Sequence, residues 1–326
     1  MVGLGVASAT TPPGYYDGAQ GKAGQELREA LHAIVRNHKV IPYSSSSQTD
    51  TSDALRILDR SPVNTNDVVE IYSGSNAPAP SFGLTTGWNR EHLWCNSYGL
   101  DDVEPAFSDL HNLRACDANV NSSRGNKYYD TTATNSSGYA FPAHAEAPLC
   151  SSDSDSWEPP LVDRGNIARA LFYMAMRYTG DQPNEPALVL TEDTALINSA
   201  STSMGKLSTL LAWHQADPVD AAEEFRNDLV YGMYQTNRNP FVDHPEWVDL
   251  AFAPAYTNRP VLNIAPAQSG MVLSWVATNQ STRLEYAMNP PAGWQELSVT
   301  PTLTNGQFLI RWTNAVPGVF FRLRAW

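Results

Sequence analysis

The feature that most constrains the fold is a change of hydrophobic period near residue 260. Before this point, apolar residues recur at helical spacing, most clearly over 163–180. After it, five short runs alternate apolar and polar residues and are separated by Gly, Pro and Asn. The change predicts two domains, 1–259 and 260–326. The second is expected to be a small all-β, sandwich-like module.

The first domain is predicted to mix helices and strands, which makes its fold class α+β. Strands are expected where apolar residues alternate or aromatic residues gather, and helices where a 3.6-residue period holds. The polar stretch 44–53 predicts a loop. The expected helices are 22–38, 117–126, 163–180, 202–217 and 218–234, and the expected strands are 67–74, 88–94 and 108–115.

The charge balance limits the function classes. The 326-residue chain has a net charge of −13, which taken alone argues against nucleic-acid binding and favours solubility in a salty or extracellular medium. No apolar run approaches the ~20 residues of a membrane span. The start, "MVGLGVASATTPPGYY", has no basic segment typical of a signal peptide, so we expect that a native signal was removed ahead of this sequence.

One short stretch carries candidate chemistry. Glu91 and His92 are adjacent in "WNREHLWC", and Asn121 follows in "DANVNSSRGN". Phosphodiester hydrolysis needs a base for water and a cation for the phosphoryl oxygens. Glu91 and Asn121 offer oxygen ligands for Mg²⁺, and a neutral imidazole is a suitable base. Ordinary polar surface or turn capping is the alternative. Because neighbours on a regular strand face opposite ways, the strand is expected to end or bulge here.

Four blocks of sequence support the interpretation as a metal site with a general base. They are "WNREHLW", "SDLHNLRACDANVNSSRGNKYYD", "WEPPLVDRGNIARALFYMAMRY" and "NRNPFVDHPEWV", within roughly 85–250. Together they resemble the bacterial endonuclease I family, secreted or periplasmic nucleases. The resemblance implies a ββα-metal (His-Me finger) core with surrounding helices. It also implies Mg²⁺, with Mn²⁺ or Ca²⁺ as alternatives. Family members cut DNA, and often RNA, with little sequence preference and leave 5′-phosphate ends, so we expect the same here. We expect a monomer.

The resemblance also implies residue roles. Glu91 and Asn121 correspond to the family's metal ligands, and His92 corresponds to its general base. Some members have an Arg between the two strands to steady the phosphate, but "NSYGLDDVEPAF" contains none. Arg124 and Arg114 are therefore the candidates for this phosphate contact. We place Arg124 in the catalytic set, and an internal ion pair is the alternative role for Arg124. His111 is expected to support the site or to be structural.

The cysteines and the acidity lead to two further expectations. A Cys116–Cys150 disulfide would tie the start of the short helix to the excursion that follows it, leaving Cys95 free; three free thiols are the alternative. Salt screens the long-range repulsion between an acidic chain and a polyanion, so the nuclease is expected to be salt-tolerant.

A rival hypothesis is a nonenzymatic binding protein with a degraded nuclease fold that acts through the β module. All three functional residue types stand at matching positions, which counts against this hypothesis. The role of the β module stays open between surface attachment, polysaccharide or partner binding, and secretion.

Overall fold

The computed structural model describes residues 11–253 without a gap and several shorter ranges after them. The described C-terminal residues are 262–267, 269–276, 282–288, 290, 293–297, 299–304, 307–313 and 318–325. The chain divides into two compact units, Met1–Ala251 and Phe252–Trp326. The expected boundary at 259/260 and the first ten residues, on which the signal-peptide expectation rests, lie outside the described residues.

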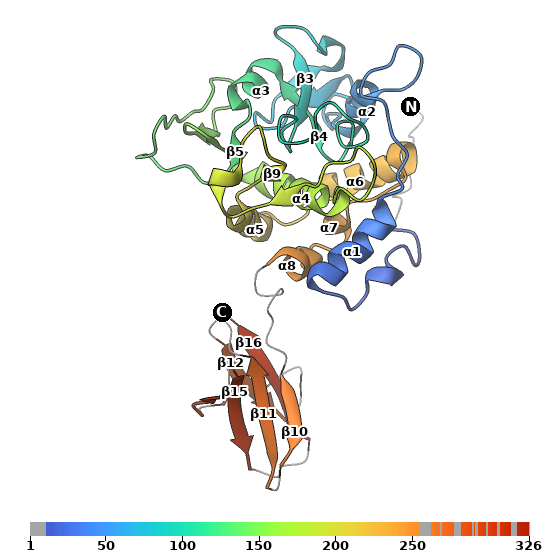
Figure 1. The fold of residues 1–326 in the computed structure, drawn as a ribbon. Helices are drawn as coiled ribbons and strands as arrows, with labels where there is room; N and C mark the ends of the chain where they lie inside the picture. The colour runs from blue at the N-terminus through green and yellow to red at the C-terminus, as the bar shows by residue number, and fades with distance from the viewer. Residues whose placement is uncertain are drawn as a thin grey trace. The chain divides into compact units, whose positions relative to one another are not determined.

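The first unit is a mixed α+β structure, as predicted (Figure 1). Its helices are α1 (Gly24–Val35), α2 (Thr51–Leu58), α3 (Ala118–Arg124), α4 (Leu161–Arg177), α5 (Leu207–Ala216), α6 (Ala221–Leu229), α7 (Pro240–Asp243) and α8 (Glu246–Phe252). Its strands are β1 (Asp67–Val69), β2 (Asn76–Pro78), β3 (Trp88–His92), β4 (Leu113–Asp117), β5 (Tyr128–Tyr129), β6 (Ser151–Ser152), β7 (Ser156–Glu158), β8 (Val189–Leu190) and β9 (Ser203–Met204). None of the helices in the described ranges has both the length and the apolar character that crossing a membrane requires.

Helix α4 is the central element of this unit. It contacts α1, α5 and α7, and Figure 1 shows it between α5 and the group formed by β3, β4 and α3. Its apolar side chains are buried almost all round, which is typical of a helix inside a core. Its two buried arginines are each paired: Arg169 with Glu223 at 2.6 Å and Arg177 with Glu185 at 2.9 Å. Helix α4 is therefore held by packing against α1, α5 and α7 and by ion pairs to α6 and to the segment that follows α4.

Strands β3 and β4 are antiparallel, and β4 leads directly into α3. The Asp117 side chain caps α3 by accepting from the N–H groups of Asn119 and Val120 at 2.8 and 3.0 Å. The strand predicted over 108–115 is in part wrong. Its first half is a turn, in which the Asn112 N–H donates to the Asp109 carbonyl, and only the second half belongs to β4.

Helix α2 begins inside the stretch 44–53 that was predicted to be a loop. Asp50 accepts from the backbone of Ser52 and Asp53, and the Asp53 side chain accepts from the Asp50 N–H, which completes a capping box. Leu55 and Leu58 bury the apolar face of the helix. The polar residues at the end of that stretch therefore begin a helix.

The second unit is built from two antiparallel sheets. One has the order β10 (Asn263–Pro266), β11 (Met271–Val276), β15 (Gln307–Trp312), β14 (Thr302–Thr304), and the other has β13 (Gln295–Glu296), β12 (Thr282–Ala287), β16 (Phe320–Ala325). Leu273 and Ile310 of the first sheet share one apolar cluster with Leu284 of the second. The five alternating runs lie on β11, β12, β13, β15 and β16, whereas β10 and β14 were not predicted.

Candidate active site

Glu91 and His92 are the last two residues of β3, and their side chains lie in different surroundings. Asn89 and Glu91 contact side chains of α3. Arg90 and His92 instead contact aromatic rings, including that of Tyr43. This division follows from the alternation of side chains along a strand.

Glu91 is buried, with 2% of its surface exposed. The Tyr72 hydroxyl donates to its Oε1 at 2.7 Å, and the Arg124 guanidinium donates to the same oxygen at 3.1 Å. Burial raises the pKa of Glu91, and the Arg124 charge and the Tyr72 hydrogen bond oppose this rise. Because every donor that reaches Glu91 within the described structure binds Oε1, Oε2 is the oxygen left for another ligand.

Asn121 presents a second oxygen from α3. Its Nδ2 donates to Asn89 Oδ1 at 2.7 Å and to the Arg90 carbonyl at 3.1 Å. Both amide protons are therefore directed at β3, and no donor in the described part of the chain reaches Oδ1. Glu91 Oε2 and Asn121 Oδ1 are thus a pair of side-chain oxygens, one carboxylate and one amide, that these contacts leave available on two elements in contact, β3 and α3.

Such a pair fits a hard divalent cation of the Mg²⁺ type, which takes one or two protein oxygens and completes its coordination with water and phosphate. Within the described residues no group of three His, Cys, Asp or Glu side chains is placed to hold a metal ion. A site with many protein ligands, such as a structural zinc site, therefore does not occur in that part of the chain.

His92 is oriented by a backbone carbonyl. Its Nε2 lies 2.9 Å from the Phe107 oxygen, which can only accept, so Nε2 carries the proton and Nδ1 has a free lone pair. The ring stacks on Phe107 and Tyr43, with centroids 4.9 and 5.6 Å apart. Burial lowers the pKa of His92 to about 4. At neutral pH the imidazole is therefore uncharged and can accept a proton at Nδ1.

The sequence model of the family described as Endonuclease I matches residues 23–246. The chain belongs to this family. The match includes β3, β4 and α3, and it ends before the second unit.

Two curated relatives of the family are similar over most of their length. One, from Bacillus subtilis (strain 168), is 41% identical over 237 residues, which is 72% of this chain and 77% of the relative. The other, from Bacillus amyloliquefaciens, is 42% identical over 237 residues, 72% of this chain and 76% of the relative. Both relatives are named extracellular ribonuclease.

Arg124 lies inside the protein, with 1% of its surface exposed. Besides Glu91, its guanidinium donates to the carbonyls of His92 and Leu93, both at 3.0 Å, and it lies 4.7 Å from the Tyr129 ring centroid. Arg124 thus secures the end of β3 and the Glu91 carboxylate. Its predicted catalytic role stays a prediction, and a direct contact with phosphate would require it to leave these bonds.

His111 and Arg114 line a small internal cavity of about 20 Å³ together with other polar side chains, including Arg226 and Glu223. Arg114 also lies 3.5 Å from Asp59 in an ion pair. His111 Nε2 and Arg114 Nε are buried without a hydrogen-bond partner in the described structure. The cavity has room for about one water molecule. The predicted substrate-binding role of these two residues remains untested.

The predicted Cys116–Cys150 disulfide is wrong: both are buried free thiols, as is Cys95. The Cys116 thiol lies 3.9 Å from the Ile71 carbonyl and the Cys150 thiol 3.6 Å from the Tyr72 carbonyl. The two cysteines therefore contact consecutive carbonyls of one turn instead of each other. Burial raises the pKa of Cys150 to about 12, which keeps this thiol protonated and unreactive.

Three residues of the site were missed in the sequence. Asn89 fixes the Asn121 amide, Tyr72 holds Glu91, and the Phe107 carbonyl orients His92. Asn89 stands inside the "WNREHLW" block, so its place beside the motif was a usable signal. Tyr72 and Phe107 carry no such signal because their contacts depend on the tertiary fold.

Proposed function

We infer that this protein is a divalent-metal-dependent endonuclease that hydrolyses nucleic acid outside the cell through a ββα-metal unit made of β3, β4 and α3. The observation that carries the inference is the set of three available acceptor atoms: Glu91 Oε2, Asn121 Oδ1 and His92 Nδ1. The extracellular location is supported by the names of the two relatives.

The residues have different roles in hydrolysis. Glu91 and Asn121 would hold the cation, which supplies positive charge to the phosphoryl oxygens and the leaving 3′-oxygen. His92 Nδ1 takes the proton of the attacking water, because its lone pair is free and the imidazole is uncharged at neutral pH. Arg90 is half-buried and stacks 3.5 Å from the Tyr43 ring centroid on the His92 side of β3, so its guanidinium is a candidate phosphate contact on that side.

Both RNA and DNA are expected substrates. Attack by water does not use the ribose 2′-hydroxyl, so this mechanism has no chemical need for RNA. The relatives are named ribonucleases, which supports RNA as one substrate. The products would carry 5′-phosphate ends. The net charge of −13 supports salt tolerance, since added salt weakens long-range repulsion of a polyanion.

The test uses paired RNA and DNA oligonucleotides of one sequence, with Mg²⁺ and with EDTA, followed by analysis of the new ends. We expect cleavage of both with Mg²⁺, none in EDTA, and 5′-phosphate ends. Cleavage of RNA alone in EDTA, with cyclic 2′,3′-phosphate ends, would instead indicate attack by the 2′-hydroxyl and overturn the proposal. No cleavage under any of these conditions would favour the nonenzymatic rival.

A further inference from the structure

Tyr72 is fully buried and joins Glu91 to a chain of hydrogen bonds. Its hydroxyl has one proton, which it donates to Glu91 Oε1 at 2.7 Å. The Tyr129 hydroxyl lies 2.6 Å from the Tyr72 hydroxyl and must then be the donor of that bond. The chain therefore runs from Tyr129 through Tyr72 to the carboxylate.

Arg124 closes this chain at both ends. It lies over the ring of Tyr129 and donates to Glu91 Oε1. Two donors, one neutral and one charged, thus meet on a single carboxylate oxygen. A carboxylate fixed in this way cannot rotate its two oxygens freely, so Oε2 keeps one direction.

The backbone of Tyr72 adopts a conformation that a tyrosine rarely takes. Its φ is 74°, in the left-handed region that favours glycine. Such a residue costs on the order of 1–3 kcal/mol and persists only where the surroundings fix it. Glycine at this position would relieve the strain and lose the hydroxyl. The presence of tyrosine instead of glycine at this strained position therefore points to a use for its side chain.

Two distant segments hold this strained residue. The Tyr72 N–H donates to Asp163 Oδ2, in the first turn of α4, at 2.9 Å. Cys150 approaches the Tyr72 carbonyl, and Trp157 packs its ring against the tyrosine ring with centroids 5.5 Å apart. The central helix and the excursion before it thus fix both the backbone and the ring of Tyr72.

We propose that Tyr72 is a positioning residue that fixes Glu91 as a one-oxygen metal ligand, with Oε2 as the ligand atom and Tyr129 and Arg124 as its supports. The inference rests on the proposed metal-dependent function and names a residue outside the ligand set. Groups that orient a metal ligand typically contribute 10–100-fold to metal affinity. The role requires only the hydroxyl, because the ring and the backbone pack in the same way without it.

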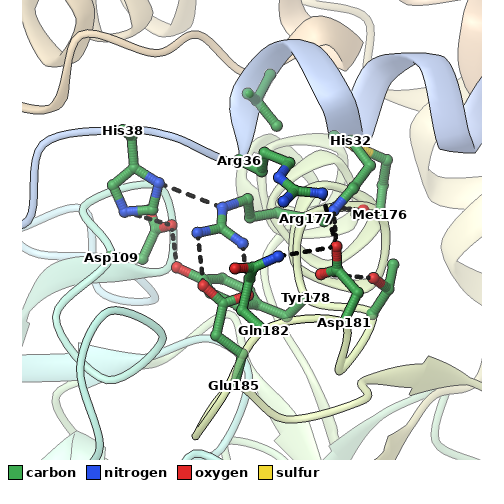
Figure 2. Close-up of polar contacts among 12 residues, drawn as sticks. His32, Arg36, His38, Asp109, Met176, Arg177, Tyr178, Asp181, Gln182 and Glu185 are labelled. Atoms are coloured by element: carbon green, nitrogen blue, oxygen red, sulfur yellow. Dashed lines mark hydrogen bonds and ion pairs between the residues drawn. The ribbon is translucent and has the colours of Figure 1, made fainter.

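A matched control exists in the same unit. The Tyr178 hydroxyl donates to Asp109 Oδ2 at 2.7 Å, also fully buried, in a network with His38, Arg177 and Glu185 (Figure 2). Tyr178→Phe therefore removes the same kind of buried phenol–carboxylate bond at a place that the proposed chemistry does not use.

The experiment measures Mn²⁺ binding by calorimetry, without substrate, for the full-length protein and for Tyr72→Phe, Tyr129→Phe and Tyr178→Phe. We expect Tyr72→Phe to weaken binding by about 10–100-fold. Tyr129→Phe should weaken it less, and Tyr178→Phe should leave it unchanged while lowering the melting temperature. The Mg²⁺ concentration for half-maximal cleavage should rise by the same factor as the dissociation constant, with kcat at saturating Mg²⁺ largely restored.

Unchanged metal affinity in a folded Tyr72→Phe protein would overturn the inference. If Tyr72→Phe does not fold, Tyr129→Phe decides, because it removes the next donor and leaves the strained turn intact. Failure of the original protein to bind Mn²⁺ would instead overturn the proposed function, so the two failures are distinguishable.

Discussion

The two faces of strand β3 carry neighbouring residues in opposite surroundings. On one face, Glu91 is held by a guanidinium and a hydroxyl, so that its charge is compensated. On the other, His92 is enclosed by the rings of Tyr43 and Phe107 and contacts one carbonyl. The first face stabilises an ionised carboxylate, and the second keeps the His92 imidazole uncharged at neutral pH.

This difference shows how one short strand can supply two functions with opposite requirements. A metal ligand must be ionised, so Glu91 needs Arg124 to offset the cost of burial. A base must be neutral, and burial by itself secures that for His92. Placing the two residues next to each other, where β3 ends, separates their surroundings within a single strand.

Removing the Glu91 carboxylate should have the largest effect on the cleavage rate. Glu91→Ala deletes the carboxylate ligand and leaves Arg124 without its partner, so we expect cleavage to fall by roughly 10³–10⁴-fold or more, as the metal contribution is lost. Raised Mg²⁺ should recover a little of the rate. Glu158→Ala, which breaks the 2.7 Å pair with Arg164, is the matched control and should retain most of the activity. Initial rates with a labelled oligonucleotide measure both.

Removing the His92 imidazole should slow cleavage less, and added metal should not restore the rate. His92→Ala is expected to slow cleavage by roughly 10²–10⁴-fold, the range for loss of a general base, with Mn²⁺ affinity unchanged. His214→Ala is the control, since His214 is also buried with Nε2 3.0 Å from a carbonyl, that of Pro245. If high Mg²⁺ restored the cleavage rate of His92→Ala, or if both variants lost the same rate, His92 would not be the general base.

The elements of the site could be predicted from the sequence far better than its contacts. The helix α3 and the strand β3 follow from local patterns and from the four blocks, which is why Glu91, His92 and Asn121 could be named. Tyr72, nineteen positions before Glu91, could not, because its direction depends on a left-handed turn held by α4. The mistaken disulfide has the same cause: whether Cys116 and Cys150 bond to each other depends on side-chain directions.

Polar residues with two possible structural roles account for two of the errors in the predicted elements. The serine-rich part of the stretch 44–53 is a loop, as predicted, but its last residues begin α2, because Asp50 and Asp53 form a capping box that the prediction missed. His111 was placed on a strand, whereas it lies in the turn that Asp109 organises by accepting from the His111 N–H. A side-chain hydrogen bond to a nearby N–H can cap a helix or close a turn, and short sequence windows do not distinguish these outcomes.

A milder change tests Asn121 as the amide ligand of the metal. Asn121→Ala removes a neutral oxygen, so we expect a loss of about 10–100-fold at low Mg²⁺ that shrinks as Mg²⁺ rises. Asn119→Ala changes an exposed residue of the same helix and should have no effect. Mg²⁺ titrations of the cleavage rate separate a shift in half-saturation from a loss of maximal rate. Full activity of Asn121→Ala at low Mg²⁺ would remove Asn121 from the ligand set.

The smallest expected effect concerns pH and sharpens the account of the neutral face. Burial lowers the pKa of His92 to about 4, so the base stays unprotonated well below the usual histidine pKa of about 6.5. At saturating Mg²⁺, kcat/KM should therefore change little between pH 8 and about pH 5.5 and fall only at lower pH. Between about pH 6.5 and 4 the unfolded chain binds a proton at His92 that the folded chain excludes, so stability falls as pH falls through this window, by at most roughly 3 kcal/mol. His92→Ala should lose this part of the pH dependence of the melting temperature, whereas the part that comes from His111, whose pKa burial also lowers to about 4, should remain. An activity midpoint near pH 6.5 would mean that His92 is solvated like a free imidazole and that the aromatic face does not control its charge.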